Sequence, residues 1–237
     1  MPLAGVLESP FVAMSAQTVS LVLASNSPRR RELLALGGWL FNLDVANINE
    51  DVHPGEQPAA YVERLAVEKA QAVLPRSRPD QVLIGSDTTV ALDGEILGKP
   101  ADEAEARSML TRLRGREHQV YTGIAVLRVA EQTLFSDVCL TNVPMRNYSD
   151  AEMEAYIQSG DPLDKAGAYG IQSPNFQPVI NMQGCYASVM GLPLCHLTVL
   201  LRRLDISPRA DVARNCQATL NYACPIFHSI LKSELAK

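Results

Sequence analysis

The sequence has no excess of positive charge and no long apolar run, and each absence excludes a class of protein. With 21 Lys and Arg against 26 Asp and Glu, the net charge of −5 gives no general attraction to nucleic acid or anionic membranes. No apolar run reaches the roughly 20 residues that a transmembrane helix needs. We therefore expect neither nucleic acid nor a membrane as a partner, and basic residues must be concentrated locally if phosphate is bound.

Cysteine and histidine are few and lack the spacing of a redox or zinc site. The five cysteines are scattered and none forms a CxxC pair, and no histidine has ligand spacing with another histidine or a cysteine. This pattern indicates reduced thiols in a cytoplasmic protein. The chain also lacks a GxxxxGK[ST] loop, a GxGxxG motif and a nucleophile elbow, so the sequence gives no indication of the enzyme classes that these three motifs mark.

The order of apolar and polar segments predicts an α/β protein. At 237 residues the chain is long enough for one α/β domain or two close lobes. Hairpin signals coexist with strand–helix units, so we expect a mixed central β-sheet flanked by helices, with polar loops opening into one cleft. We predict an antiparallel strand pair at about 118–129 and 133–145, and short strands at 179–180 and 186–189. We predict helices at about 58–74 and 102–113, a helix capped by Ser149, and a final helix from about 191 to 204.

The stretch 21–38 predicts a strand, a small-residue turn and a helix N-terminus. An apolar run ends at Ser25, Ser27 is suited to cap a helix, and Pro28 is suited to its first turn. The free N–H groups there bind anions, and the basic run 29–31 would add guanidinium groups for phosphate. The alternative is a solvated basic helix start.

Asp87 stands inside the otherwise apolar strand predicted over 81–92. A carboxylate in such a strand is costly to bury unless it is paired, binds metal or lines a pocket, so we favour a functional role over a strand end. Asp93 and Gly94 predict a hairpin turn whose return strand would bring Lys99 near Asp87. The alternative for Lys99 is an ordinary edge-strand lysine.

Three further positions are ambiguous by themselves. Glu50 and Asp51, on a polar loop, could hold Mg²⁺ together with Asp87, although a solvated acidic loop is the simpler interpretation. Lys69 lies on a predicted helix, where a surface lysine is the default. Gln172 follows a glycine-rich segment and could bind a base edge or orient water, or it could lie on a structural turn.

Five segments together resemble one family, the Maf nucleoside triphosphate pyrophosphatases, first named for inhibition of septum formation. In order, the segments are LASNSPRRRELL, GSDTTVALDGEILGKP, REHQVYTGIAV, GDPLDKAGAYGIQ and SVMGLPL. The resemblance covers about residues 21–204, and DKAGAYGIQ is the form found in the branch acting on dTTP and UTP. It implies a fold similar to inosine-triphosphate pyrophosphatases, with a deep cleft. It also implies a cytoplasmic enzyme that uses a divalent cation and is often a homodimer.

The resemblance also assigns roles to individual residues. It places the proton acceptor on Asp87, an acidic loop residue on Glu50 and two lysines on Lys69 and Lys99. The phosphate-contacting residues fall on Ser25, Ser27, Arg29 and Arg30, and those linked to base selectivity fall on Arg29, Thr88 and Gln172. We take Asp87, Glu50 and Lys99 as the catalytic group, with Glu50 and Asp87 holding Mg²⁺ or Mn²⁺. The sequence departs from the family pattern at Ser173 and Pro174, where glycine is frequent.

These implications define the domain organisation and the function that we expect. We predict a disordered leader over 1–19, a Maf-like domain over 20–205 and a C-terminal extension of unknown role over 206–237. The expected reaction is hydrolysis of dTTP and UTP to the monophosphate and pyrophosphate, and modified pyrimidine triphosphates are possible substrates. The alternative is a nucleotide-binding regulator of cell division with little catalysis.

Overall fold

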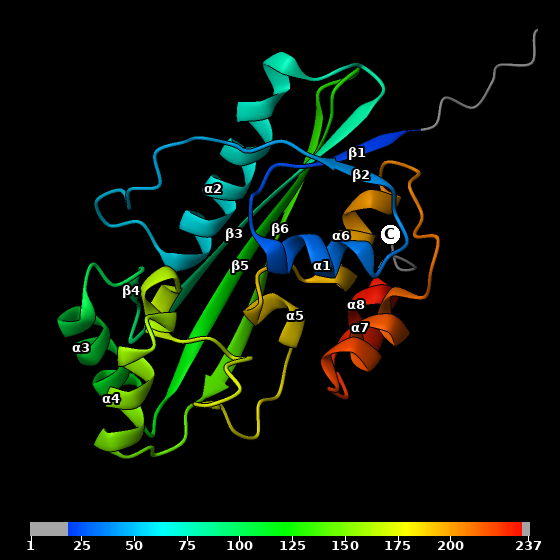
Figure 1. Ribbon diagram of the computed structural model, residues 1–237. Helices are drawn as coiled ribbons and strands as arrows, with labels where there is room; N and C mark the ends of the chain where they lie inside the picture. The colour runs from blue at the N-terminus through cyan, green and yellow to red at the C-terminus, as the bar shows by residue number, and fades with distance from the viewer. Residues whose placement is uncertain (1–18, 234–237) are drawn as a thin grey trace, which may run out of the picture.

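The centre of the computed structural model, which describes residues 19–233, is a mixed β-sheet with long antiparallel strands (Figure 1). In the described chain the strand order is β2-β1-β3-β5-β6, and β4 pairs with β3 beside this path. The pairs β1–β2 and β1–β3 are parallel, whereas β3–β5 and β5–β6 are antiparallel. The strands are β1 (Ser20–Leu23), β2 (Phe41–Leu43), β3 (Gln81–Leu92), β4 (Glu95–Leu97), β5 (Glu117–Arg128) and β6 (Thr133–Pro144).

β3 is one continuous strand that runs unbroken from Gln81 to Leu92 in the centre of the sheet. Its apolar ends are buried, and its polar segment stays in register with β5, where Asp87 faces Gly123 and Thr88 faces Thr122. The polar residues therefore do not break the strand, and Asp87 lies at its middle rather than at an end. The predicted hairpin at Asp93 is confirmed, because β4 pairs antiparallel with β3 directly after it.

The helices begin where short polar side chains can accept their free N–H groups. Ser27 accepts from the backbone N–H of Arg30, and Ser149 forms a full capping box with Glu152. Both caps confirm the sequence prediction. The helices are α1 (Pro28–Ala35), α2 (Pro58–Val73), α3 (Glu103–Leu113), α4 (Asp150–Gln158), α5 (Tyr186–Val189), α6 (Leu194–Arg202), α7 (Val212–Leu220) and α8 (Phe227–Lys232), with 3₁₀ turns at Leu74–Arg76, Asp161–Asp164 and Ala166–Ala168.

The sheet has a different cover on each face (Figure 1). Helix α2 packs on one face, where alternate strand residues such as Leu83 and Ala125 meet its Ala66 and Ala70. On the other face the core includes Ile84 and side chains from α1, α5 and α6. Helices α3 and α4 close the far end of the long strands in a third cluster. The predicted mixed sheet flanked by helices is confirmed.

Two glycines let α2 lie unusually close to the sheet. A Cβ added to Gly85 in β3 would come within 1.9 Å of the Ala66 carbonyl oxygen, and one added to Gly123 in β5 within 2.2 Å of the Val62 carbonyl oxygen. Only glycine leaves room for the helix backbone at these positions. The close approach brings Lys69, on the same helix, over the middle of β3.

Two strand predictions in the second half of the chain need correction, and the predicted N-terminal leader falls mostly outside the structure. Tyr186–Val189 is helix α5 and not a strand, because the Cys185 side chain caps it by accepting from the Ser188 N–H. Near 179–180 there is only an isolated bridge between Met145 and Val179. The predicted leader lies mostly outside the described residues. None of the helices within 19–233 is both long and apolar enough to cross a membrane.

The close approach of α2 predicts that Gly123→Ala destabilises the protein. The added methyl group must push the α2 backbone away, and overpacking of this kind costs about 1–3 kcal/mol. Urea denaturation measures the loss. Gly98→Ala is the matched control, because a Cβ at Gly98 meets nothing within 4 Å. Equal stability of the two variants would contradict the proposed packing role.

Candidate active site

The first side of the candidate site is the N-terminus of α1. Ser25 follows β1 with its hydroxyl 3.2 Å from the Ser27 N–H and 3.3 Å from Arg30 Nη1. The Ser27 hydroxyl accepts from the Arg30 N–H at 3.4 Å. The two serines therefore order the turn that precedes the helix. Pro28 has no N–H, and the Arg30 and Arg31 N–H groups both donate to Ser27, so within the described chain the Arg29 N–H is the early helical donor that stays available for an anion.

Arg30 does not extend into solvent but turns back onto the sheet. Its Nε donates to the Gly191 carbonyl oxygen at 2.9 Å, and its Nη2 lies 3.4 Å from the Thr88 hydroxyl. Burial lowers the pKa of the Arg30 guanidinium, while the charges of Asp87 and Glu50 oppose that shift. The interpretation of this run as a purely solvated helix start is therefore wrong for Arg30.

A layer of buried hydroxyl and carbonyl groups supports Arg30 from below. The Thr88 hydroxyl lies 3.0 Å from the Thr122 hydroxyl, which donates to the Ser188 carbonyl oxygen at 2.8 Å. Ser86 donates to the Gly191 carbonyl oxygen at 2.9 Å, so that oxygen accepts from both Ser86 and Arg30. Gly191 has a φ of 110° and no room for a larger side chain beside Arg30.

The second side of the candidate site is built on the Lys69 ammonium group. Its Nζ lies 2.6 Å from Asp87 Oδ1 and 2.7 Å from Glu50 Oε1. Lys69 and Asp87 are each only 7% exposed, whereas the Glu50 side chain is 52% exposed. Lys69 is thus a buried residue that joins two carboxylates, and the default interpretation of a surface lysine is wrong.

The acidic loop reaches this cluster because α2 holds it. The Tyr61 hydroxyl donates to the Glu50 carbonyl oxygen at 2.8 Å, and Arg64 donates to the Asp51 carbonyl oxygen at 3.0 Å. Burial and the charges of Asp87 and Glu50 raise the pKa of Tyr61 to about 12, so its hydroxyl stays protonated as a donor. The Asp51 side chain is exposed and lies outside the cluster.

The charges around Glu50 connect the two sides of the site. Burial opposes ionisation of Glu50, but the Lys69 hydrogen bond and the charges of Lys69, Lys99 and Arg30 together hold its pKa below the ordinary value. Lys99 is exposed and follows β4, whose pairing with β3 directs the chain back toward Thr88. Arg29 is half-buried and acts electrostatically on Arg30 and on Asp161.

The structure therefore brings together most of the predicted site residues. Gln172 is the exception, because it is exposed and forms no hydrogen bond with any residue in the described chain. Sequence reasoning missed the supporting layer, although Ser86 and Thr122 are polar residues in otherwise apolar strands and carried that signal. The residues that converge are Ser25, Ser27, Arg29, Arg30, Glu50, Lys69, Asp87, Thr88 and Lys99.

The donor set suits a hard cation that arrives with a phosphate ligand. Within residues 19–233, no group of three or more His, Cys, Asp or Glu side chains could hold a metal ion. Glu50 and Asp87 supply two carboxylates at one point, and Mg²⁺ is usually bound by one or two carboxylates together with substrate phosphates and water. The two carboxylates therefore fit a cation shared with the substrate, and not a fully protein-enclosed metal.

The shared ammonium predicts the effect of Lys69→Met. Removing one partner of a buried ion pair leaves Asp87 unpaired, which should lower the free energy of unfolding by about 3–5 kcal/mol at pH 7. The folded-state pKa of Glu50 lies below its ordinary value of 4.5, so its stabilising contribution is full above that pH and is lost as the pH falls. The deficit should therefore shrink only as the pH falls below 4.5, and should be smaller at pH 3 than at pH 7.

Urea denaturation at both pH values measures this difference. Lys232→Met removes an exposed lysine from α8 and serves as the control, with stability expected to be unchanged. A deficit of equal size at pH 7 and pH 3 would contradict the assigned role of the carboxylates.

Comparisons with known proteins identify the family to which the chain belongs. The chain is 50% identical to the dTTP/UTP pyrophosphatase of Myxococcus xanthus over 81% of this chain and 96% of that protein. It is 46% identical to the dTTP/UTP pyrophosphatase of Vibrio cholerae over 77% and 97%, respectively. Among solved structures, the Staphylococcus aureus Ham1 protein matches at a TM-score of 0.44 with 15% identity, over 85% of this chain and 98% of that chain. The model of the Maf-like protein family matches residues 20–204, and the chain belongs to this family.

Proposed function

We propose that this protein is a nucleoside triphosphate pyrophosphatase that hydrolyses dTTP and UTP to the monophosphate and pyrophosphate. The observation that carries the proposal is the Lys69 ammonium, which joins Glu50 and Asp87 within the electrostatic reach of Arg30. Cationic groups and carboxylates thus meet at one place, as a triphosphate with its cation requires. The relatives at 43–50% identity that are named for this activity support the substrate class.

The cationic side would bind the phosphates. A bound polyphosphate would be surrounded by the Arg29 N–H at the start of α1, the guanidinium groups of Arg29 and Arg30, and the Lys99 ammonium. Because Arg30 is held by Gly191 and Thr88, its guanidinium is oriented before the substrate arrives. Preoriented charge stabilises the phosphate oxygens most where negative charge grows in the transition state.

The acidic side would supply the proton acceptor. Asp87 Oδ1 is bonded to Lys69, which leaves Oδ2 to accept a proton from the water that attacks the α-phosphorus. Glu50 and Asp87 would also hold Mg²⁺ or Mn²⁺ directly or through water, and the cation would neutralise phosphate charge. Lys69 keeps both carboxylates at their positions. Base selection by Thr88 and Gln172, action in the cytoplasm and a homodimer remain expectations from the family.

A panel of triphosphates tests the proposed function. Pyrophosphate release should be fastest with dTTP and UTP, should yield the monophosphate, and should stop when a chelator removes the divalent cation. Modified pyrimidine triphosphates belong in the same panel. Nucleotide binding without release of pyrophosphate from any substrate would refute catalysis and favour the regulator of cell division.

Replacing the proton acceptor should abolish most of the turnover. Asp87→Asn keeps the side-chain shape but removes the basic oxygen, so kcat for dTTP should fall by a factor on the order of 10² or more. Asp93→Asn is the matched control, because Asp93 is exposed and pairs with Arg116 at the hairpin. Near-normal turnover by Asp87→Asn would remove this residue from the mechanism.

A further inference from the structure

The C-terminal extension, described here over residues 206–233, folds back onto two elements of the candidate site. The family model ends at Leu204, so this segment lies outside the region that defines the family. Its helices α7 and α8 lie beside α6, on the sheet face that carries α1 and α5 (Figure 1). The extension therefore contacts the elements that hold Arg30.

The first contact is with the end of α1. Asn215 in α7 donates from Nδ2 to the Leu36 carbonyl oxygen at 2.9 Å. The backbone N–H groups of Arg209 and Ala210 both donate to the Gly37 carbonyl oxygen, at 3.0 and 3.2 Å. These bonds satisfy carbonyl groups at the helix C-terminus. They fix the end of the helix whose first turn carries Arg29 and Arg30.

The second contact is made by one hydroxyl group. The Tyr222 hydroxyl lies 3.1 Å from the carbonyl oxygens of Met182 and Gly184, and it accepts from the Gly184 N–H at 3.2 Å. The Gly184 backbone has a φ of 156°, which residues with a side chain rarely adopt. A single side chain of the extension therefore holds both backbone groups of Gly184.

A short path leads from Gly184 to the guanidinium group. Cys185 directly follows and caps α5. The last turn of that helix provides the Ser188 carbonyl oxygen that accepts from Thr122, and the chain then reaches Gly191, whose carbonyl oxygen accepts from Arg30. The position of Gly184 therefore sets the position of the carbonyl groups beneath Arg30.

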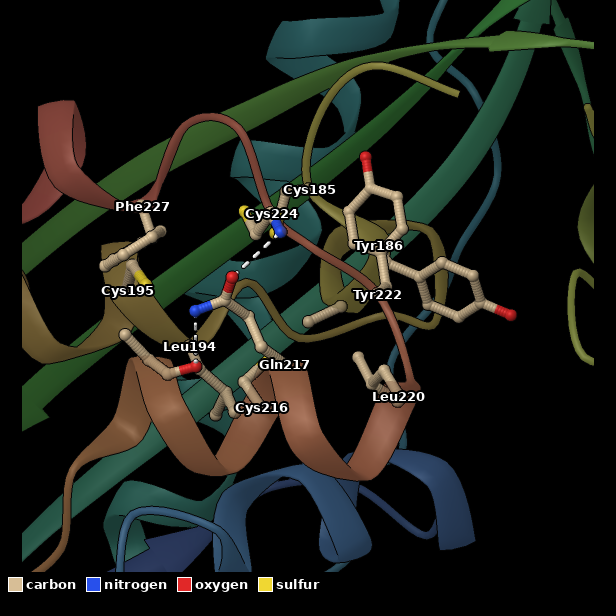
Figure 2. A pocket seen from close by; sticks show the side chains of 12 residues that line it. Cys185, Tyr186, Leu194, Cys195, Cys216, Gln217, Leu220, Tyr222, Cys224 and Phe227 are labelled. Carbon is tan, nitrogen blue, oxygen red and sulfur yellow. Dashed lines mark hydrogen bonds between the residues drawn. The ribbon is translucent and has the colours of Figure 1, made fainter. Parts of the chain in front are cut away.

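The apolar contact between the extension and the domain does not fix this position by itself. Apolar side chains of α5, α6 and the extension meet around a small space of about 20 Å³. Figure 2 shows Cys185, Cys195, Cys216 and Phe227 among the residues that line it. Apolar contact is non-directional. The hydrogen bonds of Tyr222 are directional, so they determine the position and orientation of the backbone from 182 to 185.

We propose that the C-terminal extension positions the active site, with Tyr222 as a positioning residue that acts through Gly184 and Gly191 on Arg30. The inference rests on the proposed pyrophosphatase function. It assigns to residues outside the family domain a part in orienting the phosphate-binding guanidinium. The Tyr222 hydroxyl contributes through the Met182 and Gly184 backbone groups that it holds.

Tyr222→Phe tests the proposal in the full chain. The variant removes the hydroxyl and keeps the ring, which packs against Tyr186 at 5.4 Å between centroids. We expect kcat/KM for dTTP to fall three- to tenfold. Ser229→Ala is the matched control, because it removes a hydroxyl that bonds only within the extension, to the Ile226 carbonyl oxygen. Its kcat/KM should equal that of the wild type.

A double-mutant cycle separates positioning from general destabilisation. If Tyr222 acts through Arg30, Tyr222→Phe should cost less than twofold in an Arg30→Lys background. Loss of folded protein would instead multiply the two effects. An equal loss in both backgrounds, or no loss in the wild-type background, overturns the proposal. Asn215→Ala removes the contact at α1 and should show the same dependence on Arg30.

Hydrogen exchange keeps this test separate from the proposed function. The amides of residues 184–191 should exchange faster in Tyr222→Phe than in the wild type and in Ser229→Ala, whether or not the wild type hydrolyses dTTP. Unchanged exchange refutes the role of Tyr222. A wild-type protein that releases no pyrophosphate refutes the proposed function instead.

Discussion

The candidate site depends on one buried ammonium group, Lys69 Nζ, placed between two carboxylates. Burying an ammonium or a carboxylate alone costs several kcal/mol. The two charges can be buried together only where their attraction at short distance offsets that cost. That distance exists because Gly85 and Gly123 let α2 rest on the strands. The middle of the sheet, the helix above it and the acidic loop therefore form one electrostatic unit.

A second charge, the half-buried Arg30 guanidinium, interacts electrostatically with Asp87 and Glu50 and depends on a different part of the chain. Its position is set by the Gly191 carbonyl oxygen, which comes from the joint between α5 and α6. The phosphate-binding side is thus assembled from segments about 160 residues apart in sequence. The C-terminal extension contacts both segments. Through these contacts, residues outside the family domain can affect the position of Arg30 and hence the activity.

Local features of the fold were predictable because neighbouring residues determine them. The Ser27 cap, the hairpin at Asp93 and the capping box at Ser149 each depend on four or five consecutive residues. The burial of Lys69 was not predictable from its own helix, since it depends on strand residues far along the chain. Helix α7 was not predicted, although Asp211 caps it and its inward residues Val212, Cys216 and Leu220 have helical spacing. The family resemblance supplied the roles that spacing alone left open.

The central claim is that the cationic and acidic groups surround one triphosphate. A crystal structure with Mn²⁺ and a dTTP analogue carrying NH in place of the α–β bridging oxygen tests it most directly. The account predicts phosphate oxygens in contact with Arg30 and the α1 N-terminus, and the cation at Glu50 and Asp87. An analogue bound elsewhere, with the Lys69 cluster facing only water, would contradict it.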